Sequence, residues 1–384
     1  MNPSPEPTQG PTREHAVDAV RAAALLMLIV YHASILFQDW AVKLFWVQND
    51  RLLHEVWWVM QIFNIWRLPI LFFVSGMGVR FAMQRRTNTE LLKERFRRIV
   101  VPYIAGALTV GALSNALSAF AFGQEVTYMP SDYHLWFLGN ITGYVLITFP
   151  LFRWLKNRPN GAALNGLRWL LRTGLFVPVF AFPGAMEAAA IQPEHFASFA
   201  HTNHGVWFGG ICFCFGFLSA CVMQEFKAAT ANRRWRLTAL ALCLWAFRAS
   251  WMAHDPELGG LVRSFTGIDL VAASNSITAL ESMVWILAVM GHAFRHWHRG
   301  FPGLPYLSAA VYPIYIVHQP IQNALALALP AVKWNPWVEF GLIVAAILGM
   351  SVAAYEGIRR VRWLRPLFGV KPQPNPEAAG GATP

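Results

Sequence analysis

Charged residues are scarce in this chain. Only 13% of its 384 residues are Asp, Glu, Lys or Arg, whereas 55% are hydrophobic. A soluble domain of this length needs more charge to cover its surface. Apolar runs of about 20 residues, each long enough to cross a ~30 Å hydrocarbon core, recur along almost the whole sequence. This composition excludes an ordinary soluble protein and predicts an all-α, polytopic membrane protein.

Cysteine is also rare, and the common catalytic motifs are missing. The sequence has no nucleotide-phosphate motif, no Gly-x-Ser-x-Gly and no Cys-x-x-Cys. His292, His296 and His298 lack enough further ligands nearby, so we expect no metal. Four cysteines lie inside apolar segments and are interpreted as packing residues: Cys212, Cys214, Cys221 and Cys243.

The apolar runs divide the chain into ten predicted membrane-spanning helices. The fifth is the weakest, because Pro178, Pro183 and Gly184 interrupt it. We interpret residues 1–15 and 367–384 as disordered cytoplasmic tails and residues 16–366 as one transmembrane domain. The ten spans are predicted at residues 17–38, 57–82, 99–121, 134–154, 169–190, 204–224, 235–253, 271–293, 304–329 and 336–357.

The net charge of +11 comes from Lys and Arg in short connections between the apolar runs. This placement is typical of topology determinants beside anionic membrane lipid, so we expect no nucleic-acid partner. With the N-terminus inside, the outer connections hold only Lys43, Arg51, Arg263 and Lys333. The inner ones hold most of the others, including Arg359, Arg360, Arg362, Arg365 and Lys371 near the chain's end. The asymmetry predicts that both termini are cytoplasmic.

Two polar residues bracket the first span in the stretch RAAALLMLIVYH, Arg21 to His32. Eleven helical steps place both side chains on one face, about 16 Å apart. Arg21 then lies at the cytoplasmic boundary, where it could bind an anion or simply extend to water. His32 lies near the middle of the membrane, either as a hydrogen-bonded packing residue or as a catalytic base. We expect the two side chains to border one passage.

Two further histidines are candidates for the same chemistry. His318, in YPIYIVHQP, lies about as far into the ninth span as His32 lies into the first, so both imidazoles should be at similar depth. Imidazole titrates near neutrality and suits general-base work on a hydroxyl. His134, in DYHLWFL, opens the fourth span at the outer boundary. There it could meet an acceptor or act as an interfacial anchor.

The connection between the second and third spans, QRRTNTELLKERFRRIVVPY, is rich in arginine. Guanidinium groups bind phosphate through paired hydrogen bonds, so Arg95 and Arg98 could hold a nucleotide or pyrophosphate. Contact with lipid headgroups is the alternative interpretation. Arg21 is expected at the same membrane face.

Three more charges inside predicted spans require partners. Asp18 is three residues before Arg21 and can pair with it. Glu356, in VAAYEGIRR, ends the tenth span level with Arg21. Arg67, about ten residues into the second span, should meet a carboxylate, a carbonyl or a polar cavity. Two interpretations of Arg67 remain: it forms a structural pair, or it contacts the substrate.

Several of these segments together resemble the membrane acyltransferase-3 family. They are VDAVRAAALLMLIVYH, RLPILFFVSGMGV, RFRRIVVP, HLWFL, YIVHQP and YEGIRR, which follow the family's order over nearly the whole chain. HLWFL and YIVHQP are most similar to members that succinylate periplasmic glucans.

The resemblance implies transfer of an acyl group, acetyl or succinyl, from cytoplasmic acyl-CoA to a hydroxyl of an extracytoplasmic carbohydrate or lipid-linked acceptor. Acyl-CoA would be a co-substrate, with no tightly bound cofactor, and the location a bacterial inner membrane. His32 matches the catalytic histidine, Arg21 the donor site, and Arg95 and Arg98 the basic pair near the coenzyme. His134 and His318, like Arg67 and Glu356, lie in matching segments.

Two other functions stay open at this point. A proton-coupled secondary transporter would use the histidines as a relay, although the sequence shows no inverted repeat. An inactive relative could serve as a membrane scaffold. The acyl group, the acceptor and a possible homo-oligomer are not fixed by the residues.

Overall fold

The protein is described from a computed structural model, which covers residues 14–252, 270–328 and 335–371. These residues form helices and connecting segments, with no strand among them. Arg263 and Lys333, assigned above to outer connections, lie outside the described ranges.

The first half of the chain contains α1 (His15–Ile35), η1 (Ala41–Leu44), α2 (Glu55–Asn64), α3 (Arg67–Arg85), α4 (Asn88–Arg95), η2 (Phe96–Val100), α5 (Val101–Gly106), η3 (Ala107–Gly111), α6 (Ala112–Ala121), α7 (Trp136–Lys156) and α8 (Ala162–Thr173). The second half contains α9 (Phe176–Ile191), α10 (Asn203–Cys221), α11 (Met223–Met252), α13 (Leu270–His296), α14 (Leu304–Ala328), α15 (Pro336–Arg360) and α16 (Leu364–Leu367).

Six helical stretches in the described ranges are long and apolar enough to cross a membrane. They are His15–Ile35, Glu55–Arg85, Asn88–Ala121, Asn203–Cys221, Val271–His296 and Pro336–Arg360. The bent pair α8 and α9 makes a seventh if it is counted as one span. Helices α7, α11 and α14 occupy three other predicted spans without meeting the same test. The chain is thus an all-helical, polytopic membrane protein, and the count of ten spans stays a prediction.

The fifth predicted span is broken at a different residue from the one expected. The chain turns by 113° between α8 and α9 at Gly174, which has a left-handed backbone with φ of 89°. Helix α9 then continues through Pro183. Pro178 lies in its first turn, where a missing N–H costs no intrahelical hydrogen bond. The break therefore follows from a glycine helix end rather than from the prolines.

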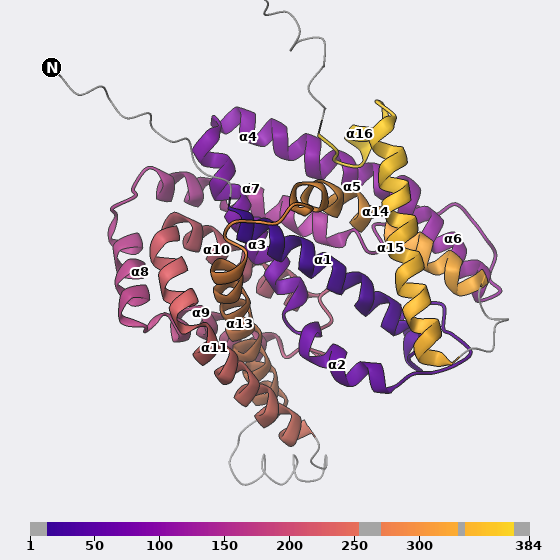
Figure 1. Cartoon of the computed structure of the whole chain (residues 1–384), viewed down its shortest axis with the longest axis horizontal. Helices are drawn as coiled ribbons and strands as arrows, with labels where there is room; N and C mark the ends of the chain where they lie inside the picture. Colours follow the sequence, from indigo (N-terminus) through magenta and orange to yellow (C-terminus); the bar gives the residue numbers. More distant parts are fainter. Residues whose placement is uncertain (1–13, 253–269, 329–334, 372–384) are drawn as a thin grey trace, which may run out of the picture.

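Helix α1 lies at the centre of the bundle and contacts α2, α3, α13, α14 and α15 (Figure 1). It contains neither glycine nor proline, so its backbone runs without interruption from His15 to Ile35. Many of its buried positions are alanines, which let neighbouring helices approach closely. This uninterrupted helix has Arg21 in its first half and His32 near its C-terminal end.

Helices α3 and α10 pack backbone against backbone. A Cβ atom added to Gly76 would lie 1.9 Å from the carbonyl oxygen of Phe213. One added to Gly216 would lie 1.8 Å from the carbonyl oxygen of Phe73. Close approach through small residues is the main way in which helices gain contact energy inside a membrane. The two glycines therefore allow the close contact between α3 and α10.

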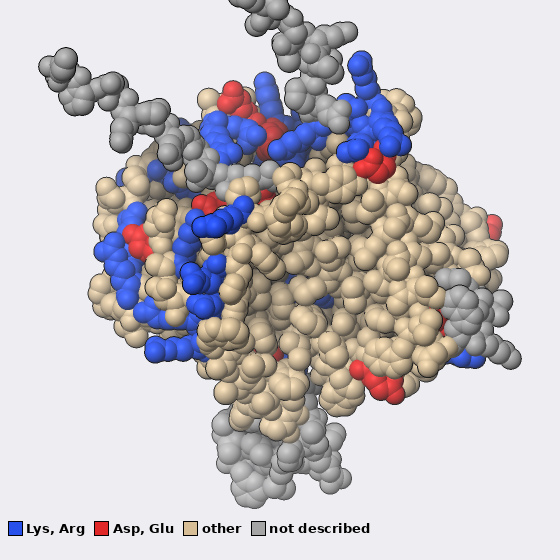
Figure 2. Space-filling model, in the orientation of Figure 1, with Lys and Arg blue, Asp and Glu red and all other residues tan. Residues whose placement is uncertain are grey.

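Basic side chains gather on one part of the surface, around α4, α8 and α16 (Figure 2). Glu14, just before α1, and Lys371, the last described residue, line the same cavity. Both described ends thus lie on one face of the bundle. The tail predicted from residue 367 includes residues that the structure packs against the bundle, because Gly369 lies against Tyr312.

We predict that Gly216→Ala lowers the thermal stability of the detergent-purified protein, because the new methyl group must push α3 away from α10. Gly349→Ala is the matched control, since a Cβ at that helical glycine meets nothing within 4 Å. The measurement is the unfolding midpoint by intrinsic tryptophan fluorescence. Equal midpoints for the two variants would contradict this account of the interface.

Candidate functional site

Three histidines from three helical regions meet where α1 packs against α14. Nδ1 of His32 lies 3.0 Å from Nε2 of His318, and the two rings stack with centroids 5.2 Å apart. The ring of His134, just before α7, lies edge-on to His318 at 5.1 Å. His318 is fully buried, whereas His32 keeps part of its surface exposed. The expectation that His32 and His318 lie at the same depth is confirmed.

The hydrogen bonds define which nitrogen of His32 can accept a proton. Nδ1 of His318 lies 2.7 Å from the carbonyl oxygen of Tyr315, and a carbonyl can only accept a hydrogen bond. Nδ1 must donate, so Nε2 of a neutral His318 is an acceptor. His32 then donates from its own Nδ1, which leaves the lone pair of its neutral ring on Nε2. Gln322 also donates to the carbonyl of His32, at 3.1 Å, and joins the two helices again.

His134 stabilises a break in the hydrogen bonding of α14. Pro320 has no N–H for the carbonyl of Ile316, four residues earlier. Nε2 of His134 donates to that carbonyl at 2.9 Å and to the carbonyl of Tyr315 at 3.1 Å. The hydroxyl of Tyr315 donates back to the carbonyl of His134. His134 is 6% exposed, so it lies inside the bundle and positions the segment that carries His318.

Arg67 is 2% exposed and lies at the start of α3. Its Nη2 donates to Oδ1 of Asn64 at 2.9 Å, and its Cζ lies 3.3 Å from the ring centroid of Tyr31. Its Nε and Nη1 have no hydrogen-bond partner in the described part of the chain. Of the expected partners, a carboxylate, a carbonyl or a polar cavity, the structure shows a carbonyl, that of the Asn64 side-chain amide, and it adds the aromatic face of Tyr31. Because Tyr31 precedes His32, with ring centroids 5.8 Å apart, the Arg67 guanidinium lies close to the histidines.

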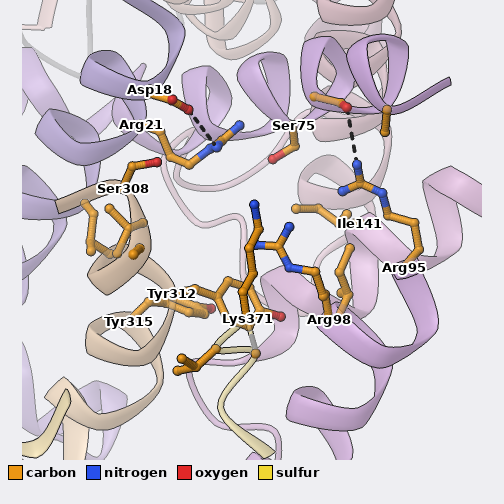
Figure 3. A pocket seen from close by; sticks show the side chains of 18 of the residues that line it. Asp18, Arg21, Ser75, Arg95, Arg98, Ile141, Ser308, Tyr312, Tyr315 and Lys371 are labelled. Atoms are coloured by element: carbon orange, nitrogen blue, oxygen red, sulfur yellow. Dashed lines mark hydrogen bonds and ion pairs between the residues drawn. The ribbon is translucent and has the colours of Figure 1, made fainter. Parts of the chain in front are cut away.

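A cavity of about 770 Å³ opens at the basic face of the bundle (Figure 3). Arg21, Arg95 and Arg98 all line it, together with Asp18. The prediction that the three arginines share one membrane face is confirmed by this geometry. Farther in, the walls become apolar and include Leu25, Leu68 and Phe137.

Hydrogen bonds and ion pairs hold the cavity's arginines in place. Arg21 pairs with Asp18 at 3.5 Å, as predicted, and its Nη2 lies 3.5 Å from the carbonyl oxygen of Val74. Arg95 donates to the carbonyl of Gly78 at 3.2 Å. Its Nε lies 3.3 Å from Glu94, whose other oxygen lies 3.0 Å from Nη1 of Arg98. Clustered guanidinium groups give the cavity a positive potential, which attracts anions and is chemically suited to phosphate.

Glu356 does not face this cavity. It pairs with Arg359 at 2.8 Å and accepts a hydrogen bond from Tyr306 at 2.8 Å. Its neighbours Tyr355 and Arg359 line the cavity instead. Glu356, predicted level with Arg21, therefore does not line the cavity itself, and its ion pair orients Arg359, which does.

The expectation that Arg21 and His32 border one passage is wrong for this conformation. The cavity contains Arg21 and Leu25 but not His32, which lies seven residues, about 10 Å, beyond Leu25 on α1. The cavity ends at Leu68, Phe137 and Tyr315, which we call the inner layer. Tyr315 borders the cavity with its side chain and holds His318 with its carbonyl. The inner layer separates the two halves of the site.

Sequence reasoning missed several cavity residues near the end of the chain. Arg359, Arg365 and Lys371 line the cavity, although their spacing suggested only an inner-side topology signal. Tyr31, which supports Arg67, was also missed. No local pattern reveals these residues, because their roles depend on which distant helices pack together.

The acyltransferase domain model of the acyltransferase 3 family matches residues 14–356. This match covers the three histidines, the cavity residues Arg21, Arg95 and Arg98, and the described helices from α1 to α15 except the last turn of α15. No curated protein and no solved structure matches the chain.

We predict that His134→Phe lowers the thermal stability, because the carbonyl of Ile316 loses its donor, at a cost of about 1–3 kcal/mol for an unsatisfied group, while the carbonyl of Tyr315 keeps its hydrogen bond from His318. Adding Pro320→Ala supplies the missing N–H to Ile316 and should recover part of the loss. The unfolding midpoints of the single and double variants are the measurement, with the exposed His54→Phe as control. Additive losses in the double variant would contradict this role for His134.

Proposed function

This chain is a membrane acyltransferase of the acyltransferase 3 family, and we propose that it moves an acyl group from cytoplasmic acyl-CoA to a hydroxyl of an extracytoplasmic glycan or lipid-linked carbohydrate. One observation carries the proposal. A single helix, α1, contributes Arg21 to a basic cavity on one face and His32 to a histidine cluster about 16 Å farther along.

The cavity suits the polar end of acyl-CoA. Its mouth is cationic and its inner part is apolar, which matches a nucleotide with phosphate groups followed by a largely uncharged pantetheine arm. Arg21, Arg95 and Arg98 would hold the pyrophosphate, since charge-assisted hydrogen bonds to phosphate are among the strongest available to a protein. Acyl-CoA is a co-substrate in this scheme, with no resident cofactor.

His32 is the general base of the proposed reaction. The acceptor hydroxyl attacks the thioester carbon and gives its proton to Nε2 of His32. The carbon–sulfur bond then breaks, and the departing sulfur takes the proton to leave free CoA and an ester. His318 holds His32 in the tautomer that this step needs, through the 3.0 Å contact between Nε2 of His318 and Nδ1 of His32. Tyr315 and Ser75 already donate their hydroxyl hydrogens to carbonyls, so neither is placed as an oxyanion donor in this conformation.

The acceptor and donor reach His32 from opposite sides in this proposal. The exposed part of His32 lies outside the donor cavity, and the ring of Trp46 from the segment after η1 lies edge-on to it at 4.9 Å. An acceptor would enter past Trp46. For the thioester to arrive from the cavity, side chains of the inner layer must move. Such opening is an expected conformational step, since it keeps water from the thioester until the donor is bound.

The proposal extends to the chemical class of the acyl group. The segments HLWFL and YIVHQP are similar to those of glucans biosynthesis protein C, which succinylates glucans, and we retain acetyl and succinyl as candidates. Arg67, buried beside Tyr31 and next to His32, would suit an acyl group with a terminal carboxylate. The proposed location is a bacterial inner membrane, with the basic face in the cytoplasm.

We predict that His32→Ala lowers the transfer of radiolabelled acetyl or succinyl from CoA to glycan by roughly 100-fold or more, as expected for removal of a general base. His318→Phe should also reduce transfer, since His32 loses the partner that sets its tautomer. The control is His195→Ala, whose imidazole is 78% exposed and far from the cluster in sequence. The assay follows label on the glycan and release of free CoA. Full activity of His32→Ala would sink the proposal.

A second prediction concerns the donor cavity. Arg95→Gln should raise KM for acyl-CoA about tenfold, with a smaller change in kcat, because a phosphate contact is lost far from the reacting atoms. Arg97→Gln is the matched control, since Arg97 is exposed and does not line the cavity. A fall in kcat at unchanged KM for Arg95→Gln would speak against phosphate binding.

A further inference from the structure

The last described residues, Arg365–Lys371, form one wall of the donor cavity. Arg365, Gly369, Val370 and Lys371 all line it, together with Arg359 at the end of α15. We propose that Lys371 and Arg365 bind the ribose 3′-phosphate of CoA, so that the C-terminal segment Arg365–Lys371 recognises the nucleotide end of the donor. This inference rests on the proposed function and extends it to a part of the site outside the matched residues 14–356.

Specific contacts hold the segment against the bundle. Nε of Arg365 donates to the carbonyl of Arg359 at 2.7 Å, and the N–H of Val370 donates to the carbonyl of Arg365 at 2.8 Å. Gly369 has a left-handed φ of 65°, and a Cβ there would lie 2.7 Å from the ring of Tyr312. Its Cβ position is also 3.2 Å from the carbonyl oxygen of Arg98. The segment is therefore seated on α14 and on the arginine-rich stretch η2.

The seated segment adds positive charge to a cavity that is already cationic. The basic lining residues are Arg21, Arg85, Arg86, Arg95, Arg98, Arg359, Arg365 and Lys371, and the acidic ones are Glu14, Asp18 and Glu94. Arg98 and Lys371 both extend into the cavity (Figure 3). Bringing so many like charges together is unfavourable unless an anion of comparable charge neutralises them. Tyr312 adds a buried hydroxyl with no hydrogen-bond partner in the described part of the chain.

The depth of each basic side chain in the cavity determines whether it would contact the pyrophosphate or the 3′-phosphate of CoA. Arg95 has 21% of its side chain exposed and lies nearer the apolar inner end, whereas Arg98 has 41% exposed. Lys371 is exposed and lies at the mouth. A pantetheine arm that points inward leaves the pyrophosphate beside the deeper arginines. The adenosine and its 3′-phosphate then remain at the mouth, beside the C-terminal segment.

The test compares CoA with 3′-dephospho-CoA, which differs only in the phosphate at issue. Equilibrium binding of both compounds is measured on the full chain in nanodiscs, for the natural protein and for Lys371→Gln. We expect the natural protein to prefer CoA about tenfold, and Lys371→Gln to lose most of that preference by binding CoA more weakly. Its affinity for 3′-dephospho-CoA should change little.

Two further variants sharpen the result. Gly369→Ala should reduce the same preference, because its methyl group would collide with Tyr312 and displace the segment while both cations remain. Arg362→Gln is the matched control, since Arg362 lies three residues before Arg365, is exposed, and does not line the cavity.

The outcomes separate this inference from the function on which it rests. An unchanged preference in Lys371→Gln, or equal weakening for both compounds, overturns the assignment of the 3′-phosphate. Binding of neither compound to the natural protein overturns the inference and the donor assignment together. A normal preference for CoA without acyl transfer in the glycan assay supports the C-terminal site and rejects only the proposed reaction.

Discussion

The contact between His32 and His318 is the interaction on which the site depends. It joins α1 to α14 at 3.0 Å. Nδ1 of His318 donates to the carbonyl of Tyr315, so Nε2 of His318 accepts from Nδ1 of His32 and thereby sets the tautomer of His32. The same segment of α14 is interrupted at Pro320, which leaves the carbonyl of Ile316 without its helical N–H, and His134 donates to that carbonyl and to the carbonyl of Tyr315. His134 thus holds the segment whose Tyr315 carbonyl determines which nitrogen of His32 can accept a proton. Inside a membrane such satisfied polar groups are stable, whereas an unsatisfied one is costly.

The sequence predicted the membrane-protein class and the grouping of its key side chains, because both follow from simple helical geometry. An eleven-residue spacing on an uninterrupted helix separates Arg21 and His32 by a known distance, and equal depth in two spans brings His318 to His32. Glycine caused the main error of local structure: the break assigned to Pro178 and Pro183 occurs at Gly174. A proline in a first turn loses no hydrogen bond, whereas a glycine with positive φ ends a helix.

The rest of the site could not be read from spacing, because it depends on contacts between distant segments. Arg359, Arg365 and Lys371 have the same local pattern as any inner-side basic cluster. Helix α15 places Arg359 at the cavity, and the packing of Gly369 on Tyr312 holds the segment of Arg365 and Lys371 there. Glu356, three residues before Arg359, turns away and pairs with it instead. Likewise, the partners of Arg67 are an amide and a tyrosine ring from the neighbouring helices, where the sequence left a carboxylate, a carbonyl or a polar cavity open.

In the proposed reaction, the inner layer keeps the donor cavity apart from the side on which the acceptor reaches His32. Tyr315 contributes to both halves, but through different atoms: its ring borders the cavity, and its carbonyl holds His318. In that proposal, a change of side-chain rotamer in Leu68 or Phe137 makes room for the thioester and leaves that carbonyl in place. Rotation of Tyr315 itself would break the hydrogen bond from its hydroxyl to the carbonyl of His134. Leu68 and Phe137 therefore offer the lower-energy passage for a thioester, because moving them costs packing contacts alone, whereas moving Tyr315 would also disturb the histidines at the moment when they are needed.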